Sequence, residues 1–269
     1  MNRIETAFAR LKSEGRSGLI PFITAGDPDL KTTGELLAEL ARAGATAIEL
    51  GVPFSDPMAD GPVIQRASER ALRHNFGMSE LLEVVAQARP LMLDVPVILF
   101  SYFNPLLQYG LERLARDASR AGVDGVLVTD LVPEEAEELS AVLAEHGLDM
   151  IFLVAPTSTD ARLSLIAERA SGFIYAVSRA GVTGAREDVS SAAERLVGRV
   201  RQFSDLPVAV GFGISTAGQV AETWRYADAA VVGSALVSEI EKAKDGTDTL
   251  ERVGQFVRGL IPSEGLVER

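Results

Sequence analysis

Residues 47–62 read AIELGVPFSDPMADGP and contain the local pattern on which the fold prediction rests. Ala47–Pro53 is a short, mostly apolar run, which is typical of a parallel strand covered on both faces. Side chains alternate along a strand, so Ile48 and Leu50 share one face while Glu49 lies on the other. The three prolines that follow Val52 fix φ and stiffen the next loop. The stretch therefore predicts a buried strand that ends in a stiff, polar loop.

Seven more apolar runs resemble this one, and segments with helical periodicity separate them. The expected strands are Leu19–Ala25, Ala47–Pro53, Pro96–Tyr102, Gly125–Asp130, Met150–Ala155, Phe173–Ser178, Pro207–Ile214 and Ala229–Val232. The expected helices include Ile4–Lys12 before the first strand, then Thr33–Ala43, Leu81–Met92, Leu111–Ala121, Glu134–His146, Ala161–Ala170, Ala192–Phe203 and Leu250–Leu260. Strict alternation predicts an α/β fold with a parallel sheet and right-handed crossovers. Eight such units predict a closed (β/α)8 TIM barrel with an extra N-terminal helix that plugs its bottom.

An open, doubly wound sheet is the alternative fold. Such a sheet normally carries a Gly-rich phosphate turn after its first strand. The first strand here leads into Gly26-Asp27-Pro28, which lacks that pattern. Because no linker or low-complexity segment interrupts the sequence, we expect residues 1–269 to form one barrel domain.

The composition excludes several classes of function. The net charge is -12, which disfavours nucleic acid and anionic membranes as partners. The absence of cysteine rules out disulfides and thiolate catalysis, and neither of the two histidines has a ligand-like spacing, so we expect no metal. No signal-peptide run and no apolar stretch of about 18 residues occurs. The cytoplasm is therefore the expected location.

Glu49 is the most unusual residue of the expected strands. Its side chain points into the barrel near the carboxyl end of the strand, where barrel enzymes place catalytic groups. A buried carboxylate without a partner is costly and has a raised pKa, which suits a general acid/base near neutral pH. A structural Glu that is hydrogen-bonded to backbone is the alternative interpretation.

Asp60 directly precedes Gly61-Pro62, at a plausible helix N-terminus. Capping a helix is a common role for Asp, and the spacing alone favours it. The alternative is a carboxylate that accepts a hydrogen bond from a substrate N–H group.

Two glycine-rich turns follow the last two expected strands. They are Gly211-Phe212-Gly213-Ile214-Ser215 and Gly233-Ser234-Ala235. In barrels, the loops after strands seven and eight often bind phosphate through backbone N–H groups and a short helix. The long loop Ser178–Asp188, after the sixth strand, is typical of a lid that excludes water.

Four segments of the chain resemble one family in the same order. They are Pro21–Pro28, Ile48–Gly61, Ser178–Gly184 and Gly211–Ser215, and they are similar to the signatures of the tryptophan synthase α subunit. The resemblance extends over nearly the whole chain.

The resemblance implies a role for each matched position. Glu49 is expected to be the general acid/base, and Asp60 is expected to orient and polarise the indole N–H. The expected indole pocket consists of Phe22, Phe100, Leu127, Tyr175 and Phe212. The expected phosphate ligands are Gly184, Gly213, Gly233 and Ser234. Arg179 and Thr183 belong to the expected lid, where Thr183 contacts Asp60 on closure.

The resemblance also implies an activity and a partner. The activity is the retro-aldol cleavage of indole-3-glycerol phosphate to indole and D-glyceraldehyde 3-phosphate, a lyase reaction of tryptophan biosynthesis. The chain is expected to need no cofactor of its own, since pyridoxal phosphate belongs to the β subunit of an α2β2 complex. The loops Pro53–Asp60 and Asn104–Tyr109 are the expected docking surface, and docking is expected to couple the two subunits allosterically.

Two positions depart from the family pattern. Phe100 stands where the family often has Leu, which affects the fit around indole. Val132 stands where the family often has Pro, which affects a loop expected to contact the partner.

Three other functions remain open at this point. The chain could be a stand-alone lyase, since the same active site would serve it. It could be an allosteric activator that binds the phosphate ligand without turnover, although Glu49 and Asp60 argue against this. An isomerase of phosphoribosyl intermediates is disfavoured by the segment Glu49–Gly61.

Overall fold

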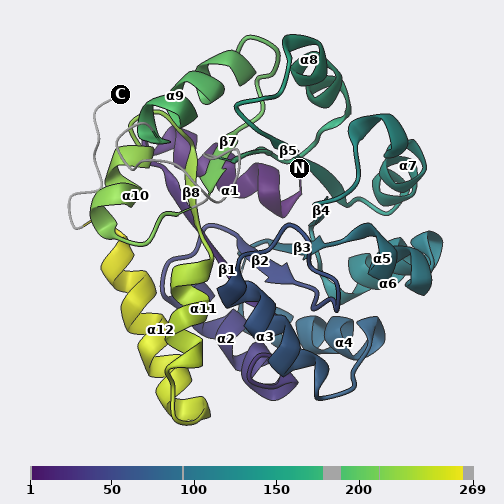
Figure 1. Cartoon of the computed structure of the whole chain (residues 1–269), viewed down its shortest axis with the longest axis vertical. Helices are drawn as coiled ribbons and strands as arrows, with labels where there is room; N and C mark the ends of the chain where they lie inside the picture. The colour runs from purple at the N-terminus through teal and green to yellow at the C-terminus, as the bar shows by residue number, and fades with distance from the viewer. Residues whose placement is uncertain (1, 93, 178–188, 212, 263–269) are drawn as a thin grey trace.

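The computed structural model describes residues 2–92, 94–177, 189–211 and 213–262. Its centre is a closed barrel in which the strands pair in chain order, and every pair is parallel. The strands are β1 (Gly18–Thr24), β2 (Ile48–Gly51), β3 (Val97–Ser101), β4 (Gly125–Val128), β5 (Asp149–Val154), β6 (Ile174–Val177), β7 (Val208–Gly211) and β8 (Ala229–Val232). Figure 1 shows this barrel with helices around it, which confirms the predicted (β/α)8 architecture.

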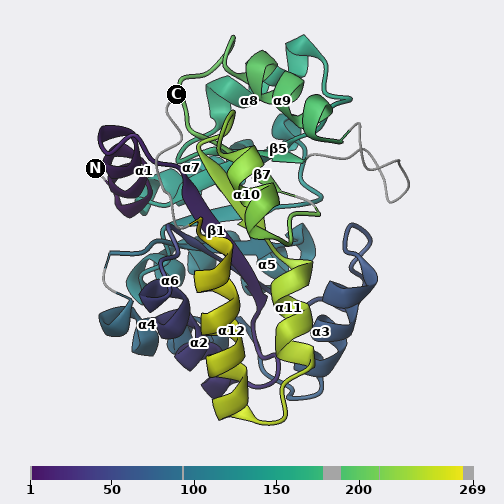
Figure 2. The same ribbon diagram turned by 90° about the vertical axis from the view of Figure 1, so that its left-hand side faces the viewer.

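The helices follow the strands in regular alternation, with two α-helices instead of one after β2, β3 and β8 and one α-helix before β1. The α-helices are α1 (Arg3–Ser13), α2 (Leu30–Arg42), α3 (Pro62–Leu72), α4 (Met78–Ala88), α5 (Phe103–Tyr109), α6 (Leu111–Ala121), α7 (Glu137–Glu145), α8 (Asp160–Arg169), α9 (Val189–Val200), α10 (Ala217–Thr223), α11 (Ser234–Glu241) and α12 (Gly246–Leu260). Two 3-10 turns are η1 (Arg89–Leu91) and η2 (Pro133–Glu135). Figure 2 shows α11 beside α12 along one flank of the barrel.

Alternation along the strands separates two layers of core. Ile48 and Leu50 pack with the surrounding helices in the outer layer, whereas Ala47 belongs to the cluster inside the barrel. This division confirms that Glu49, which alternates with Ile48 and Leu50, faces inward. The register then sets its neighbours, because Glu49 lies opposite Phe22 on β1 and Ile98 on β3.

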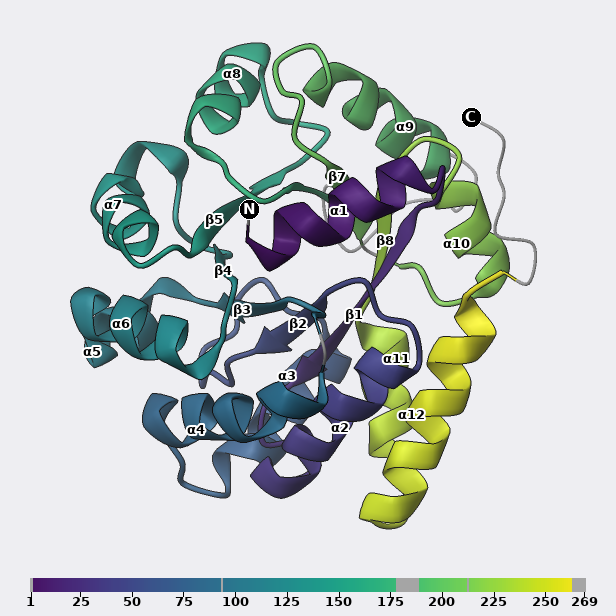
Figure 3. The same cartoon turned by 180° about the vertical axis from the view of Figure 1, so that it is seen from behind.

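Helix α1 closes the bottom of the barrel, as the sequence predicts. Its apolar residues Ile4, Phe8 and Leu11 join the interior cluster. The ring of Phe8 lies 5.6 Å from that of Phe173, between centroids. Figure 3 shows α1 lying across the strands from behind. The opposite face is thereby left for the functional site.

Three sequence expectations need correction. The expected helix Leu81–Met92 ends as an α-helix at Ala88 and continues as η1, because Pro90 has no N–H to donate. The expected helix Glu134–His146 is divided into η2 and α7. The expected loop Asn104–Tyr109 is helical and lies within α5, whose C-cap is Gly110 with φ of 92°.

Within the described residues, no helix combines the length and the apolar character that crossing a membrane requires.

Candidate active site

Glu49 lies on β2, inside the barrel and close to its upper end. Its side chain is 1% exposed, and its Oε1 has no hydrogen-bond partner among the described residues. Burial raises the pKa of this carboxyl from its usual 4.5 to about 8, because the ionised form loses hydration without gaining a compensating donor. The structure therefore holds Glu49 mainly protonated near neutral pH, with a proton available for transfer.

Tyr175 on β6 is a titratable side chain whose pKa the Glu49 carboxyl affects. Desolvation raises its pKa well above 10, and the charge of Glu49 raises it further. The phenol has room because Gly211 on β7 lacks a side chain: a Cβ there would lie 2.0 Å from the Tyr175 hydroxyl oxygen. The Tyr175 phenol consequently stays protonated and neutral beside Glu49.

Asp60 ends the stiff loop that follows β2. The N-cap of α3 is Gly61, and no side chain caps this helix. The capping interpretation that the spacing favoured is therefore wrong, because Pro62 at the first helical position moves the cap one residue onward. The Asp60 side chain instead lines a cavity at the barrel mouth.

Tyr102, directly after β3, holds Asp60 and its loop. The backbone N–H of Ala59 donates to the Tyr102 hydroxyl oxygen at 2.8 Å. Because this oxygen already accepts a bond, its own proton is available to the Asp60 carboxylate. Burial raises the pKa of Asp60 to about 6, and the Tyr102 hydrogen bond lowers it in part. Burial also raises the pKa of Tyr102 to about 12, with the Asp60 charge adding to the effect.

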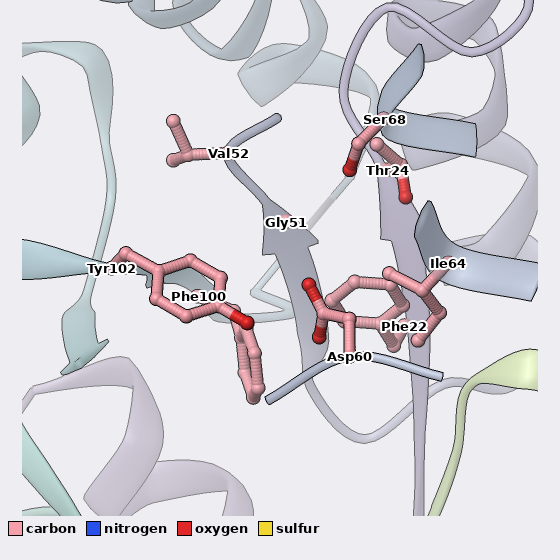
Figure 4. A pocket seen from close by; sticks show the side chains of 9 residues that line it. All are labelled: Phe22, Thr24, Gly51, Val52, Asp60, Ile64, Ser68, Phe100 and Tyr102. Carbon is pink, nitrogen blue, oxygen red and sulfur yellow. The ribbon is translucent and has the colours of Figure 1, made fainter. Parts of the chain in front are cut away.

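A small cavity lies between Asp60 and the ends of β1, β2 and β3 (Figure 4). It is lined by Phe22, Thr24, Gly51, Val52, Asp60, Ile64, Ser68, Phe100 and Tyr102. Its volume of about 10 Å³ is close to the space of one water molecule. An indole ring is far larger and does not fit in this cavity.

The expected indole-pocket residues fall into two adjoining groups. Phe22 and Phe100 border the cavity and meet edge to face, with centroids 5.3 Å apart. Leu127 and Tyr175 lie deeper, in the interior cluster against which Phe100 also packs. Phe22 additionally contacts the cluster formed with Ala67 of α3 and Val237 of α11. These four side chains come from β1, β3, β4 and β6 and therefore lie around the inside of the barrel.

The two glycine-rich turns follow β7 and β8, which are neighbours in the barrel. Gly213 has φ of 78°, a conformation that favours glycine, and its residue is exposed. Gly233 is the N-cap of α11, and Ser234 is the exposed first residue of this helix. A helix N-terminus with free N–H groups beside an open turn is suited to an anion.

The strand order fixes the separation between this anion site and Glu49. Only β1 lies between β8 and β2, so the turn after β8 is about two interstrand spacings from β2, or roughly 10 Å, and the turn after β7 is one spacing further. A small phosphorylated molecule can bridge that gap. Glu49 and the turns therefore meet the geometric condition for one shared ligand.

Several expected site residues lie outside the described residues. They are Arg179, Thr183 and Gly184 in the expected lid, and Phe212 of the expected indole pocket. In the part of the chain that the structure describes, no group of three or more acidic or histidine side chains could hold a metal.

The sequence argument missed three polar residues at the site, namely Thr24, Ser68 and Tyr102. Thr24 is the last residue but one of the predicted strand Leu19–Ala25, and Tyr102 is the last of Pro96–Tyr102, so their position near strand ends was a usable signal. Ser68 belongs to α3, and only packing of this helix over the barrel mouth brings it to the cavity.

Fold and site together define a class: a (β/α)8 barrel equipped for acid–base chemistry on an anionic small molecule. A family model described as "Tryptophan synthase alpha chain" matches residues 8–261. The chain belongs to the tryptophan synthase alpha chain family.

Curated relatives and solved structures agree with this assignment. The tryptophan synthase alpha chain of Citrifermentans bemidjiense is 52% identical over 260 residues, with 97% of each chain covered. That of a Roseiflexus species is 50% identical and covers 97% of this chain and 99% of its own. The crystal structure of subunit alpha from Legionella pneumophila superposes with a TM-score of 0.89 at 40% identity, with 97% of each chain covered. The resemblance noted in the sequence is thereby confirmed, and the chain is a lyase of tryptophan biosynthesis.

Proposed function

We propose that Glu49 and Asp60 carry out the cleavage of indole-3-glycerol phosphate to indole and D-glyceraldehyde 3-phosphate. Glu49 acts as the general acid/base, and Asp60 balances charge at the indole nitrogen. The observation that carries this proposal is the buried, inward-facing Glu49 carboxyl, with β1 alone between its strand and β8, which leads into the second glycine-rich turn.

The first step is protonation of the indole ring at C3. Glu49 supplies this proton, because a carboxyl with a pKa of about 8 is mainly protonated near pH 7. Protonation makes the ring nitrogen electron-poor and its N–H more acidic. Asp60, with a pKa of about 6, is mainly ionised at the same pH and accepts a hydrogen bond from that N–H.

The second step breaks the bond between C3 and the glycerol chain. The newly ionised Glu49 removes the proton from the hydroxyl group next to C3, and this carbon becomes the aldehyde. The electron pair of the broken C–C bond returns to the ring and restores indole. Glu49 ends the cycle protonated, so protons and electrons balance without an added reagent.

The remaining contacts position the substrate. The backbone N–H groups at Gly213, Gly233 and Ser234 hold the phosphate, which does not react and supplies orientation. Phe22, Phe100, Leu127 and Tyr175 contact the indole ring. For Phe212, Gly184, Thr183 and Arg179, the roles implied by the family stay predictions.

We further propose that the chain needs no cofactor, since proton transfer and charge balance by its own side chains account for each step. Pyridoxal phosphate belongs to the partner β subunit, with which the chain forms an α2β2 complex. Exposed apolar side chains on the catalytic face support the docking surface. Met58 is 85%, Leu107 51% and Val132 41% exposed, and they follow three consecutive strands. We also propose that the whole chain folds as one domain.

A turnover assay on indole-3-glycerol phosphate tests this function, with and without a β subunit. We expect the isolated chain to release indole and the β subunit to increase the rate. Release of indole at an unchanged rate would favour a stand-alone lyase. Absence of indole under both conditions, with phosphate-ligand binding retained, would favour an allosteric activator and refute the proposed reaction.

A further inference from the structure

The hydroxyl group of Thr24 is buried without a hydrogen-bond partner among the described residues. Thr24 is the last residue of β1 and shares a face with Phe22, one step closer to the barrel mouth. Its side chain is 2% exposed, and its Oγ1 has no hydrogen-bond partner among the described residues. An unmet buried hydroxyl destabilises a fold, because it loses its hydrogen bonds to water without replacing them. Val would occupy nearly the same volume without that cost, so the hydroxyl calls for a partner.

The cavity beside Thr24 supplies the space for this partner. Its volume of about 10 Å³ is close to the minimum that one water molecule needs. Thr24, Ser68, Asp60 and Tyr102 all line it. Figure 4 shows the hydroxyl groups of Thr24 and Ser68 turned toward the space that the Asp60 carboxylate also borders. A buried water needs two to four polar partners, and these side chains provide that number.

We propose that the cavity binds one water molecule that Thr24 holds against the Asp60 carboxylate, which makes Thr24 a positioning residue for Asp60. This inference rests on the proposed role of Asp60. The water donates a hydrogen bond to the carboxylate on the side away from the substrate. It thereby favours the ionised form and fixes the orientation in which Asp60 meets the indole N–H.

Among the described residues, no charged side chain named around Asp60 is available to donate a second hydrogen bond to its carboxylate, so the additional donor is neutral. Tyr102, after β3, is the titratable side chain that hydrogen-bonds to Asp60, and Asp130 acts on Tyr102 from beyond β4. On α3, Arg66 binds Glu241 and Arg70 binds Asp27 and Glu241, each at 2.8 Å. These guanidinium groups are therefore engaged with other carboxylates. A hydroxyl-bound water is the additional donor that the cavity offers.

Two substitutions at one position separate the hydroxyl from the packing. Thr24→Val keeps the shape and removes the hydroxyl, whereas Thr24→Ser keeps the hydroxyl and removes a methyl group. We expect Thr24→Val to lower kcat/KM about tenfold at pH 7, the effect of losing one hydrogen bond to a charged group. The pKa of the acidic limb of the kcat/KM profile should rise by about one unit, because the ionised form loses a donor. Thr24→Ser should stay within about threefold of the parent.

A role in packing predicts the opposite order, in which Val is tolerated and Ser is harmful. Parent-like kcat/KM and pH profile in Thr24→Val would overturn the proposal, and so would equal damage in Thr24→Ser. Urea unfolding of both variants shows whether each is folded. A high-resolution crystal structure should show a water between Thr24 and Asp60 in the parent that is missing in Thr24→Val. Asp60→Asn is the parallel control: normal turnover there would refute the role of Asp60 itself, whereas an inactive Asp60→Asn with a normal Thr24→Val would refute only the water.

Discussion

Replacing Glu49 by Gln should stabilise the protein, increasingly so at higher pH. The pKa of Glu49 rises from 4.5 when exposed to about 8 in the fold. Below pH 4.5 the carboxyl is protonated in both states and burial has no effect on its ionisation. Above that pH the unfolded chain releases the proton while the folded chain retains it, so the free energy of unfolding falls until pH exceeds about 8. Gln, which does not ionise, removes this loss.

The magnitude follows from the two pKa values. At 1.36 kcal/mol per unit, the loss of stability is about 1 kcal/mol at pH 5, about 3 kcal/mol at pH 7 and between about 4 and 5 kcal/mol at pH 9. The stability difference between Glu49→Gln and the parent should therefore grow by about 4 kcal/mol from pH 5 to pH 9. Unequal packing of Gln and Glu adds a constant that does not depend on pH.

Urea unfolding at these three pH values measures the difference directly, with the slope m checked for each variant. Glu145→Gln, at an exposed position at the end of α7, is the matched control and should show no such trend. Parallel pH dependence of Glu49→Gln and the parent would refute the claim that Glu49 is buried and protonated.

Four further predictions concern the reaction and its ligands. The kcat/KM profile should be bell-shaped, with limbs near pH 6 and pH 8, because Asp60 must be ionised and Glu49 protonated; activity that only rises across this range would contradict the assignment. Asp60→Asn should lower kcat/KM at least about a hundredfold while calorimetry still detects glycerol phosphate binding, and a normal kcat/KM would return Asp60 to a structural role. Gly213→Ala should weaken glycerol phosphate binding about fivefold, because the free turn relaxes from φ of 78°, which costs a side-chain-bearing residue about 1 kcal/mol, and phosphate binding must restore it. An unchanged Kd would remove this turn from the phosphate site. Met58→Asp should weaken association with the β subunit, measured by sedimentation. Leu91→Asp, at an exposed position before β3, should leave association unchanged. If both variants weakened association equally, the docking surface would not be where we propose it.

Periodicity in the sequence was enough for the barrel, because strands that are buried on both faces leave nearly continuous apolar runs. It also oriented Glu49, since the alternation of Ile48, Glu49 and Leu50 admits one inward side chain. The ends of the helices were harder to predict from the sequence. Pro90 and Pro62 each moved a boundary through a missing N–H, and the second of these reversed the interpretation of Asp60.

The side chains that line the cavity, and its size, could not be obtained from the spacing of residues in the sequence. Ser68 meets Asp60 only because α3 folds over the barrel mouth, which is a tertiary contact without a local signal. The size of the cavity likewise depends on how Phe22 and Phe100 pack against each other.

The turnover number of Glu49→Gln on indole-3-glycerol phosphate tests the central claim most directly. The substitution keeps the shape of the side chain and removes its exchangeable acid proton. We predict that kcat falls at least about a hundredfold while phosphate-ligand binding is retained. A kcat within about tenfold of the parent would show that the buried carboxyl does not transfer the proton.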